Sequence, residues 1–140
     1  MASPLYPQGP ISATATLETA NTNVVTPGSG TVVTIYTGTA SGKDEIDCAI
    51  IAATAAVTAG MIRLWLYDGS IYQLIAEVPV PPWTPVNTHP QTPLWKATVT
   101  FKDADGEPKP IRLPSASYSI RGTTHVSETF RVTLQGITYA

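Results

Sequence analysis

The chain has two histidines, and neither has the neighbours of a metal site. His89 lies in a proline-rich segment, and His125 lies shortly before the last predicted strand. Protein metal sites gather several His, Cys or carboxylate ligands at short spacings, whereas neither histidine has a second His or a Cys at such a spacing. Glu128 is the one local partner that His125 could meet. We interpret both histidines as surface or turn residues.

Carboxylates gather in two short segments. Residues 103–107 (DADGE) begin like a calcium-binding loop, but such a loop needs a bidentate Glu at its twelfth position, and Pro114 stands there. The Asp-Gly pair in this segment is instead typical of a hairpin turn. Residues 43–47 (KDEID) could do acid–base work only if their surroundings separated the pKa values of the carboxyls. We interpret them as a solvated strand end that discourages edge pairing.

Nucleophile motifs are also missing. Ser29 lies in Pro-Gly-Ser-Gly, not in the Gly-x-Ser-x-Gly elbow of hydrolases, and no glycine-rich phosphate loop occurs. The single cysteine, Cys48, alternates with Ile46 and Ile50 and is predicted to be a buried, inert thiol. The sequence therefore predicts no catalytic residue, no cofactor and no metal, and we expect a protein that is not an enzyme.

Aromatic residues beside prolines are better candidates for binding. Residues 1–12 hold Pro4, Pro7 and Pro10, and residues 79–93 hold a further six prolines. Proline fixes φ and removes a backbone donor, so neither segment can be a helix or a central strand. We interpret 1–12 as an extended N-terminal arm and 79–93 as a long loop. The residues that we select as contacts with another protein are Leu5, Tyr6, Pro7, Pro82 and Trp83.

Two readings of Trp83 stay open, because it could either anchor an interface or pack beneath its own loop. Trp95 opens a predicted strand and is assigned to the core. If the arm is a docking segment, deletion of residues 1–12 weakens attachment without unfolding the domain.

The rest of the chain is predicted to form short strands. Apolar and polar residues alternate, β-branched residues are frequent, and turn signals such as Asp-Gly separate the runs. The predicted strands cover residues 31–38, 45–53, 61–67, 71–78, 95–102, 111–113, 118–123 and 129–137, with a possible first strand at 14–19. This pattern predicts an all-β fold: one antiparallel β-sandwich, jelly-roll-like, over residues 13–140.

Charge is scarce. The 140 residues include 8 Lys and Arg and 10 Asp and Glu, so 13% are charged and the net charge is −2, against about 25% charged residues in a typical domain. Without a basic excess we expect no nucleic-acid partner, and without a long apolar run we expect no membrane partner. Residues 1–42 and 78–95 carry a single charge, Glu18. These two segments are the ones that we expect other protein to cover.

Several segments carry a resemblance to a known class. They are TANTNVV (19–25), GTVVTIYTGTA (30–40), GKDEID (42–47), TAGMIRLWLYDG (58–69), AEVPV (76–80) and LPSASYSIRGTTHVSETF (113–130). Together they resemble small structural proteins of tailed bacteriophages, namely capsid decoration or cement proteins, over roughly residues 19–80 and 113–138. The resemblance implies a β-sandwich that is often trimeric, sits on the outer surface of the phage head in the virion, and clamps neighbouring copies of the major capsid protein.

Other functions fit the same pattern of strands. One is a carbohydrate-binding module on a virion or tail, which would need Trp65, Tyr67 and Tyr72 exposed together on a flat face. Another is a tail or baseplate component with the same sandwich. We expect a homotrimeric decoration protein whose partner is the major capsid protein.

Overall fold

The computed structural model describes residues 7–88 and 90–139, and over them the chain is a β-sandwich. The elements in chain order are β1 (Pro7–Leu17), the short 3-10 helix η1 (Pro27–Ser29), β2 (Val33–Thr37), β3 (Asp44–Ala53), β4 (Gly60–Tyr67), β5 (Tyr72–Val80), β6 (Lys96–Thr100), β7 (Ile111–Leu113), β8 (Ser119–Thr124) and β9 (Phe130–Tyr139). The predicted all-β, two-sheet architecture is confirmed. Each predicted strand corresponds to an observed one, because alternating runs bury one face and turn residues end them.

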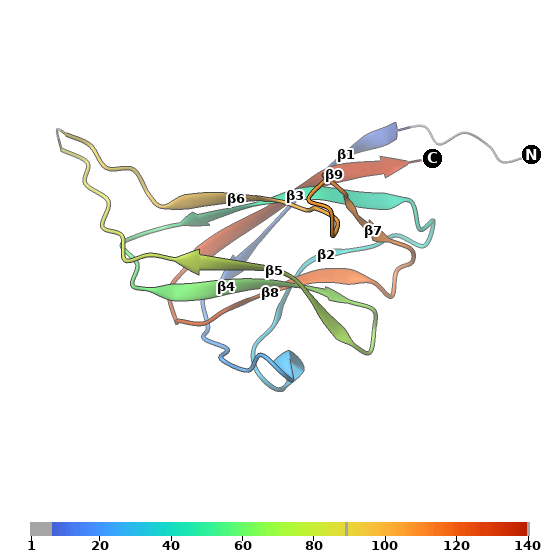
Figure 1. Ribbon diagram of the computed structural model, residues 1–140, viewed down its shortest axis with the longest axis horizontal. Coiled ribbons are helices and arrows are strands. Elements are labelled where there is room, and N and C mark those ends of the chain that lie inside the picture. Colours follow the sequence, from blue (N-terminus) through green and yellow to red (C-terminus); the bar gives the residue numbers. More distant parts are fainter. Residues whose placement is uncertain (1–6, 89, 140) are drawn as a thin grey trace, which may run out of the picture.

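Two antiparallel sheets face each other (Figure 1). One has the order β1-β9-β3-β6, with β7 also paired to β3, and the other has the order β2-β8-β4-β5. The pairing is nested along the chain: β1 pairs with β9, β2 with β8, β3 with β6 and β4 with β5. Strands distant in sequence therefore hold both sheets together.

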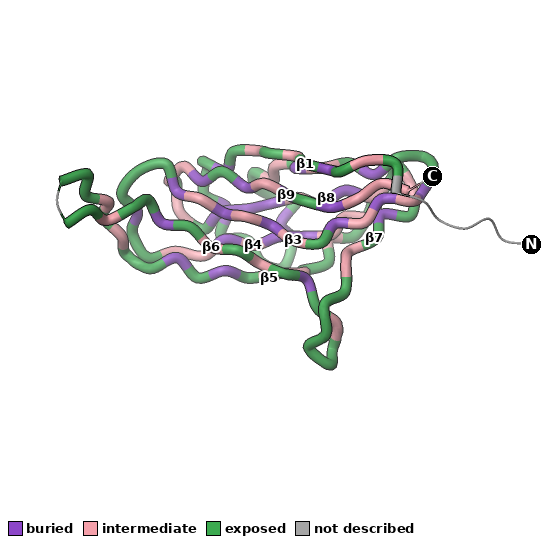
Figure 2. Tube along the Cα trace, turned by 90° about the horizontal axis from the view of Figure 1, so that it is seen from above, coloured by how far each residue is buried: buried purple, intermediate pink, exposed green. Residues whose placement is uncertain are grey.

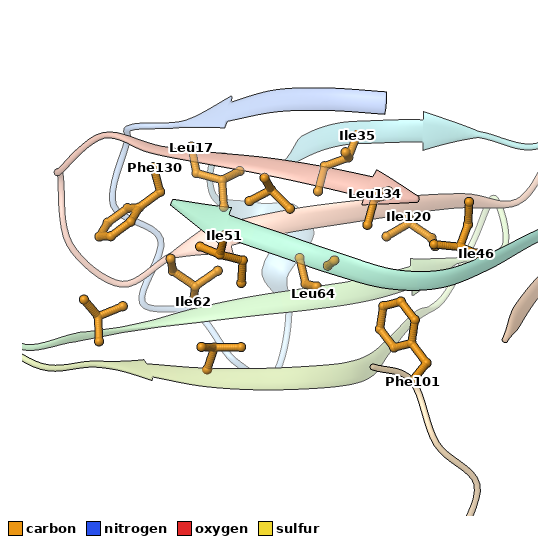
Figure 3. Close-up of a cluster of buried hydrophobic side chains, with 14 of the residues drawn as sticks. Leu17, Ile35, Ile46, Ile51, Ile62, Leu64, Phe101, Ile120, Phe130 and Leu134 are labelled. Carbon is orange, nitrogen blue, oxygen red and sulfur yellow. The ribbon is translucent and has the colours of Figure 1, made fainter. Parts of the chain in front are cut away.

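The core lies between the inner faces of the two sheets. Figure 3 shows its side chains meeting from both sheets, among them Ile51, Ile62, Leu64, Phe130 and Leu134, all with no exposed surface. Side chains from two facing sheets interdigitate in this way to form the core of a sandwich. Trp95 also belongs to this core, as predicted, and its ring meets that of Phe130 edge-on at 6.2 Å between centroids.

One predicted alternation is wrong. Cys48 and Ile50 do not share the buried face with Ile46; the buried residues of β3 are Asp44, Ile46, Ala49, Ile51 and Ala53. The cause is a bulge in the pairing of β3 with β9, whose register shifts between Ile46 and Cys48. One extra residue reverses the faces of every later side chain. Cys48 is consequently half-buried on the outer face, where its thiol lies 3.6 Å from the side-chain oxygen of Gln135.

Half of the predicted N-terminal arm belongs to the sandwich. Residues 7–12 form the first half of β1 and pair with β9, from Pro7 opposite Tyr139 to Ser12 opposite Gln135. β1 lies at the edge of its sheet. Proline is tolerated on an edge strand, because the backbone N–H that it lacks would not be needed for pairing. The sandwich therefore includes residues 7–12, and the predicted contacts Leu5 and Tyr6 lie outside the described residues.

In the described part of the chain, no helix has the length and apolar character needed to cross a membrane.

Candidate binding projection

The connection from β5 to β6 leaves the body of the sandwich. We call residues 81–95 the projection; it extends from the end opposite the start of β1 (Figure 1). Its two branches are joined where Val86 and Thr92 exchange backbone hydrogen bonds of 2.9 and 2.8 Å. Repeated prolines lack the backbone N–H groups that a longer strand pairing would need, so the projection does not join either sheet. Their fixed φ angles also restrict the conformations that its backbone can take.

Trp83 anchors the projection at its base. Its backbone exchanges two hydrogen bonds of 2.9 Å with Val57, and its indole Nε1 donates to the carbonyl oxygen of Pro93 at 2.7 Å. The ring is half-buried and packs against the core. Of the two interpretations of Trp83, packing beneath its own loop explains most of the contacts that its side chain makes. Pro82, the other predicted contact in this loop, is exposed beside it.

The rest of the projection offers apolar surface. Leu94 is 48% exposed and Val86 39% exposed, and the projection is exposed along most of its length (Figure 2). A groove of about 730 Å³ at its base is lined by Ala52, Trp83, Pro93, Leu94, Trp95 and Lys96. Large apolar side chains on a charge-free segment are typical of surfaces that other molecules cover.

The aromatic residues on the second sheet form no open platform. Trp65 is 3% exposed, and its indole Nε1 donates to Thr123 Oγ1 at 3.1 Å. Tyr67 and Tyr72 stack on each other with centroids 4.4 Å apart. The guanidinium of Arg121 lies 4.0 Å from the centre of the Tyr67 ring and donates to the Tyr72 hydroxyl at 3.0 Å. Trp65 is therefore not available to a sugar-binding face, whereas Tyr67 and Tyr72 are each partly exposed.

Asp44 is buried, and its interpretation as a solvated strand end is wrong. Its carboxylate has no exposed surface and accepts hydrogen bonds from the backbone N–H of Thr39 at 2.8 Å and from the hydroxyls of Thr138 and Tyr36. Burial by itself would raise the pKa of this carboxyl, but the hydrogen bonds outweigh it and the pKa is lowered. Burial, then the Asp44 charge, raises the pKa of Tyr36 to about 12. Through these hydrogen bonds, the buried carboxylate of β3 holds β9 and β2 beside it.

The remaining candidates are engaged locally. Asp103 Oδ1 accepts from two backbone N–H groups of its own turn, at 2.9 and 3.0 Å. The Glu128 carboxylate accepts from the backbone N–H of Thr58 at 2.9 and 3.0 Å, and His125 lies exposed on the surface. Among the described residues, which exclude His89, no three His, Cys, Asp or Glu side chains gather as metal ligands would.

No protein-family model matches this chain, and no curated protein sequence matches it. Sequence reasoning selected Trp83 and Pro82 but missed the exposed side chains of Val86 and Leu94. Apolar residues near prolines look the same in sequence whether they point inward or outward. The one available signal was the absence of charge over residues 78–95.

Proposed function

We propose that this chain is a capsid decoration protein of a tailed bacteriophage. It binds the outer surface of the assembled head as a homotrimer and holds neighbouring major capsid proteins together. The segments that carry the resemblance to decoration proteins, roughly residues 19–80 and 113–138, contribute β2–β5 and β8–β9, which are most of the sandwich. The projection lies outside those segments and supplies the features particular to this chain.

The strand order supports a structural role. Four nested antiparallel pairs folded into two four-stranded layers are what a jelly roll requires, and we infer that this sandwich is one. β7 is then a short addition that pairs with β3. Jelly rolls are a frequent architecture of viral capsid domains. Since a fold alone does not determine function, this likeness supports the proposal without carrying it.

The uncharged projection is the observation that carries the proposal. It has no Asp, Glu, Lys or Arg between its two ends, it exposes Val86 and Leu94, and the backbone of Trp83 joins it to Val57. The cores of protein interfaces are poor in charged residues and rich in large apolar ones, and a stiff segment loses little entropy on binding. A protein surface is therefore the partner that suits the projection.

The mechanism would be mechanical. A protein that binds the assembled shell and not its separate subunits stabilises the shell by mass action, by about 2.7 kcal/mol per site when the free protein is at a hundred times its Kd. Contacts that span two capsid subunits add area that resists pressure from the packaged genome. This role needs no catalytic group.

Cryo-EM of the intact particle tests the proposal. We expect the chain on the outside of the head, in hundreds of copies, as the resemblance to decoration proteins implies. Purified heads stripped of it should rebind the recombinant protein to saturation and become more resistant to heat. Density for the chain only in the tail, or heads that bind none, would contradict the proposal, and the first result would assign it to the tail.

A further inference from the structure

β6 ends its sheet, and one side of its backbone has no partner strand. The strand covers Lys96–Thr100 and pairs with β3. The residues on either side of it show which groups face β3: the carbonyl oxygen of Trp95 accepts from β3 at 2.9 Å, and the N–H of Phe101 donates to β3 at 3.2 Å. Residues facing a partner strand alternate with residues facing away from it. The N–H and C=O groups of Lys96, Thr98 and Thr100 therefore point to the open edge.

The groove at the base of the projection begins where β6 begins. Its lining includes the apolar side chains of Trp83, Leu94 and Trp95, and Lys96 is the one charged residue among the described residues that line it. The projection leads directly into β6 (Figure 1). A segment laid along the open edge of β6 would therefore reach an apolar groove at the end of the strand. In recognition by strand addition, backbone hydrogen bonds supply affinity and such grooves supply specificity.

The charge beside this edge is positive. Lys96 is exposed, and it shares a row across the sheet with Ala52 and with Arg131, which is also exposed. Within the described part of the chain, neither cation has an acidic side chain at ion-pair distance. A lysine on an edge strand discourages indiscriminate pairing, whereas opposite charges on neighbouring strands attract each other. The edge therefore favours an added strand that carries a carboxylate beside Lys96.

The other edges of the two sheets lack this combination. The strands that end the two sheet orders are β1, β2, β5 and β6. β1 and β2 contain no basic residue, and β5 contains none either but carries Glu77, which would repel a carboxylate. Exposed Pro79 also removes a donor from β5, and the pairing of β2 is interrupted by a register shift. Among these four strands, an acidic segment is best matched by β6.

We propose that the open edge of β6 accepts an extended, acidic segment of the major capsid protein as an added antiparallel strand. The inference rests on the proposed function for the identity of the partner. The segment places a carboxylate opposite Lys96, and just beyond it a large apolar side chain enters the groove beside Trp83 and Leu94. Because the edge groups of β6 already point outward, the sandwich needs no rearrangement to bind it.

A synthetic peptide tests the site without any phage particle. The acetylated and amidated peptide TVTVEVL brings its threonines opposite Thr100 and Thr98, its glutamate opposite Lys96 and its leucine to the groove. The peptide TVTVKVL is the matched control with the opposite charge. In an amide NMR titration, the acidic peptide should shift the signals of Lys96, Thr98 and Thr100 and the indole signal of Trp83. We expect it to bind about fivefold more tightly than the basic peptide.

Two variants test the backbone and the charge of the edge separately. Thr98→Pro removes an outward N–H, which an edge strand tolerates, and should weaken binding of the acidic peptide about tenfold. Lys96→Glu changes one exposed side chain and should reverse the preference between the two peptides, so it tests the site even if Thr98→Pro does not fold. Thr14→Pro is the matched control, because the same alternation followed through β3 and β9 turns the N–H of Thr14 to the open edge of β1.

Three results would overturn the inference: an acidic peptide that binds no more tightly than the basic one, β6 amide signals that do not shift, or a Lys96→Glu variant that keeps the wild-type preference. Stripped heads then distinguish this inference from the proposed function. If heads bind wild type and Lys96→Glu equally well, the decoration role stands and the β6 contact with the capsid falls. If heads bind no wild type, the decoration role falls, and the strand site on β6 stands or falls on the peptide titration.

Discussion

The buried carboxylate of Asp44 should make the stability of this protein depend on pH in a way that one substitution removes. Asp44→Asn keeps the size of the side chain but replaces one acceptor oxygen by an NH2 donor. That donor would face the groups that now donate to the carboxylate, Thr39 N–H and the hydroxyls of Thr138 and Tyr36. At least one buried donor would then lose its partner.

The size of the effect follows from those contacts. A hydrogen bond to a charged group contributes about 1.5–3 kcal/mol, and a buried donor left unpaired costs a similar amount. We therefore expect Asp44→Asn to lower the free energy of unfolding at neutral pH by about 3 kcal/mol, out of the roughly 5–15 kcal/mol typical of a folded domain. Asp47→Asn is the matched control, because Asp47 lies in the same strand with its side chain exposed.

The sign of the pH dependence is set by the lowered pKa of Asp44. Between the folded and the unfolded pKa, the unfolded chain binds the proton and the native one does not, so stability rises with pH across that interval. The contribution of Asp44 is present above the unfolded value of about 3.9 and is lost as pH falls through the folded pKa.

Urea unfolding followed by tryptophan fluorescence, repeated from pH 7 down to about pH 2, measures this contribution. The gap between wild type and Asp44→Asn should be widest near neutral pH and narrow in acid, while Asp47→Asn should follow wild type within about 0.5 kcal/mol. A variant as stable as wild type at neutral pH would show that the three hydrogen bonds do not stabilise the fold. A gap that is the same at every pH would show that the ionised form is not what they favour.

Three further outcomes follow from the packing. Gly136→Ala should destabilise the fold by about 3 kcal/mol or more, seen in urea unfolding, because the added Cβ would overlap the carbonyl oxygen of Glu45. Trp83→Phe, which keeps a ring but loses the indole hydrogen bond, should raise the rate of hydrogen exchange in the projection by about fivefold, equivalent to about 1 kcal/mol. Deletion of residues 1–12 should lower the unfolding midpoint, because it removes the first half of β1.

Local patterns were enough to predict the strands. Alternation identified the runs, and the Asp-Gly pairs marked two turns, where Gly69 and Gly106 take φ values of 101° and 82°. The bulge in β3 could not be predicted, because it depends on the register with β9, a strand far away in the sequence. The face of Cys48 was assigned wrongly for that reason. The length of β1 was missed because prolines exclude a central strand but not an edge strand.

The candidate surfaces were only partly visible in the sequence. The proline-rich segment stood out through its composition, and Trp83 with it. Nothing in the sequence distinguished Val25 from the many valines of the strands, because its exposure depends on the way that Asn21 folds the loop back. Ile71 was missed likewise, since an isoleucine that opens a predicted strand is normally assigned to the core. The exposure of a side chain depends on the tertiary fold, so it could not be predicted for Val25 and Ile71 from the sequence alone.

The distribution of charge along the sequence sets two exposed loops apart from the rest of the chain. The sequence has two segments nearly free of charge, residues 1–42 and 78–95. The structure places the exposed loop around Val25 in the first and the whole projection in the second. Solvent-exposed loops normally gain solubility from charged side chains, so two exposed and rigid loops without them are explained most simply if each is covered.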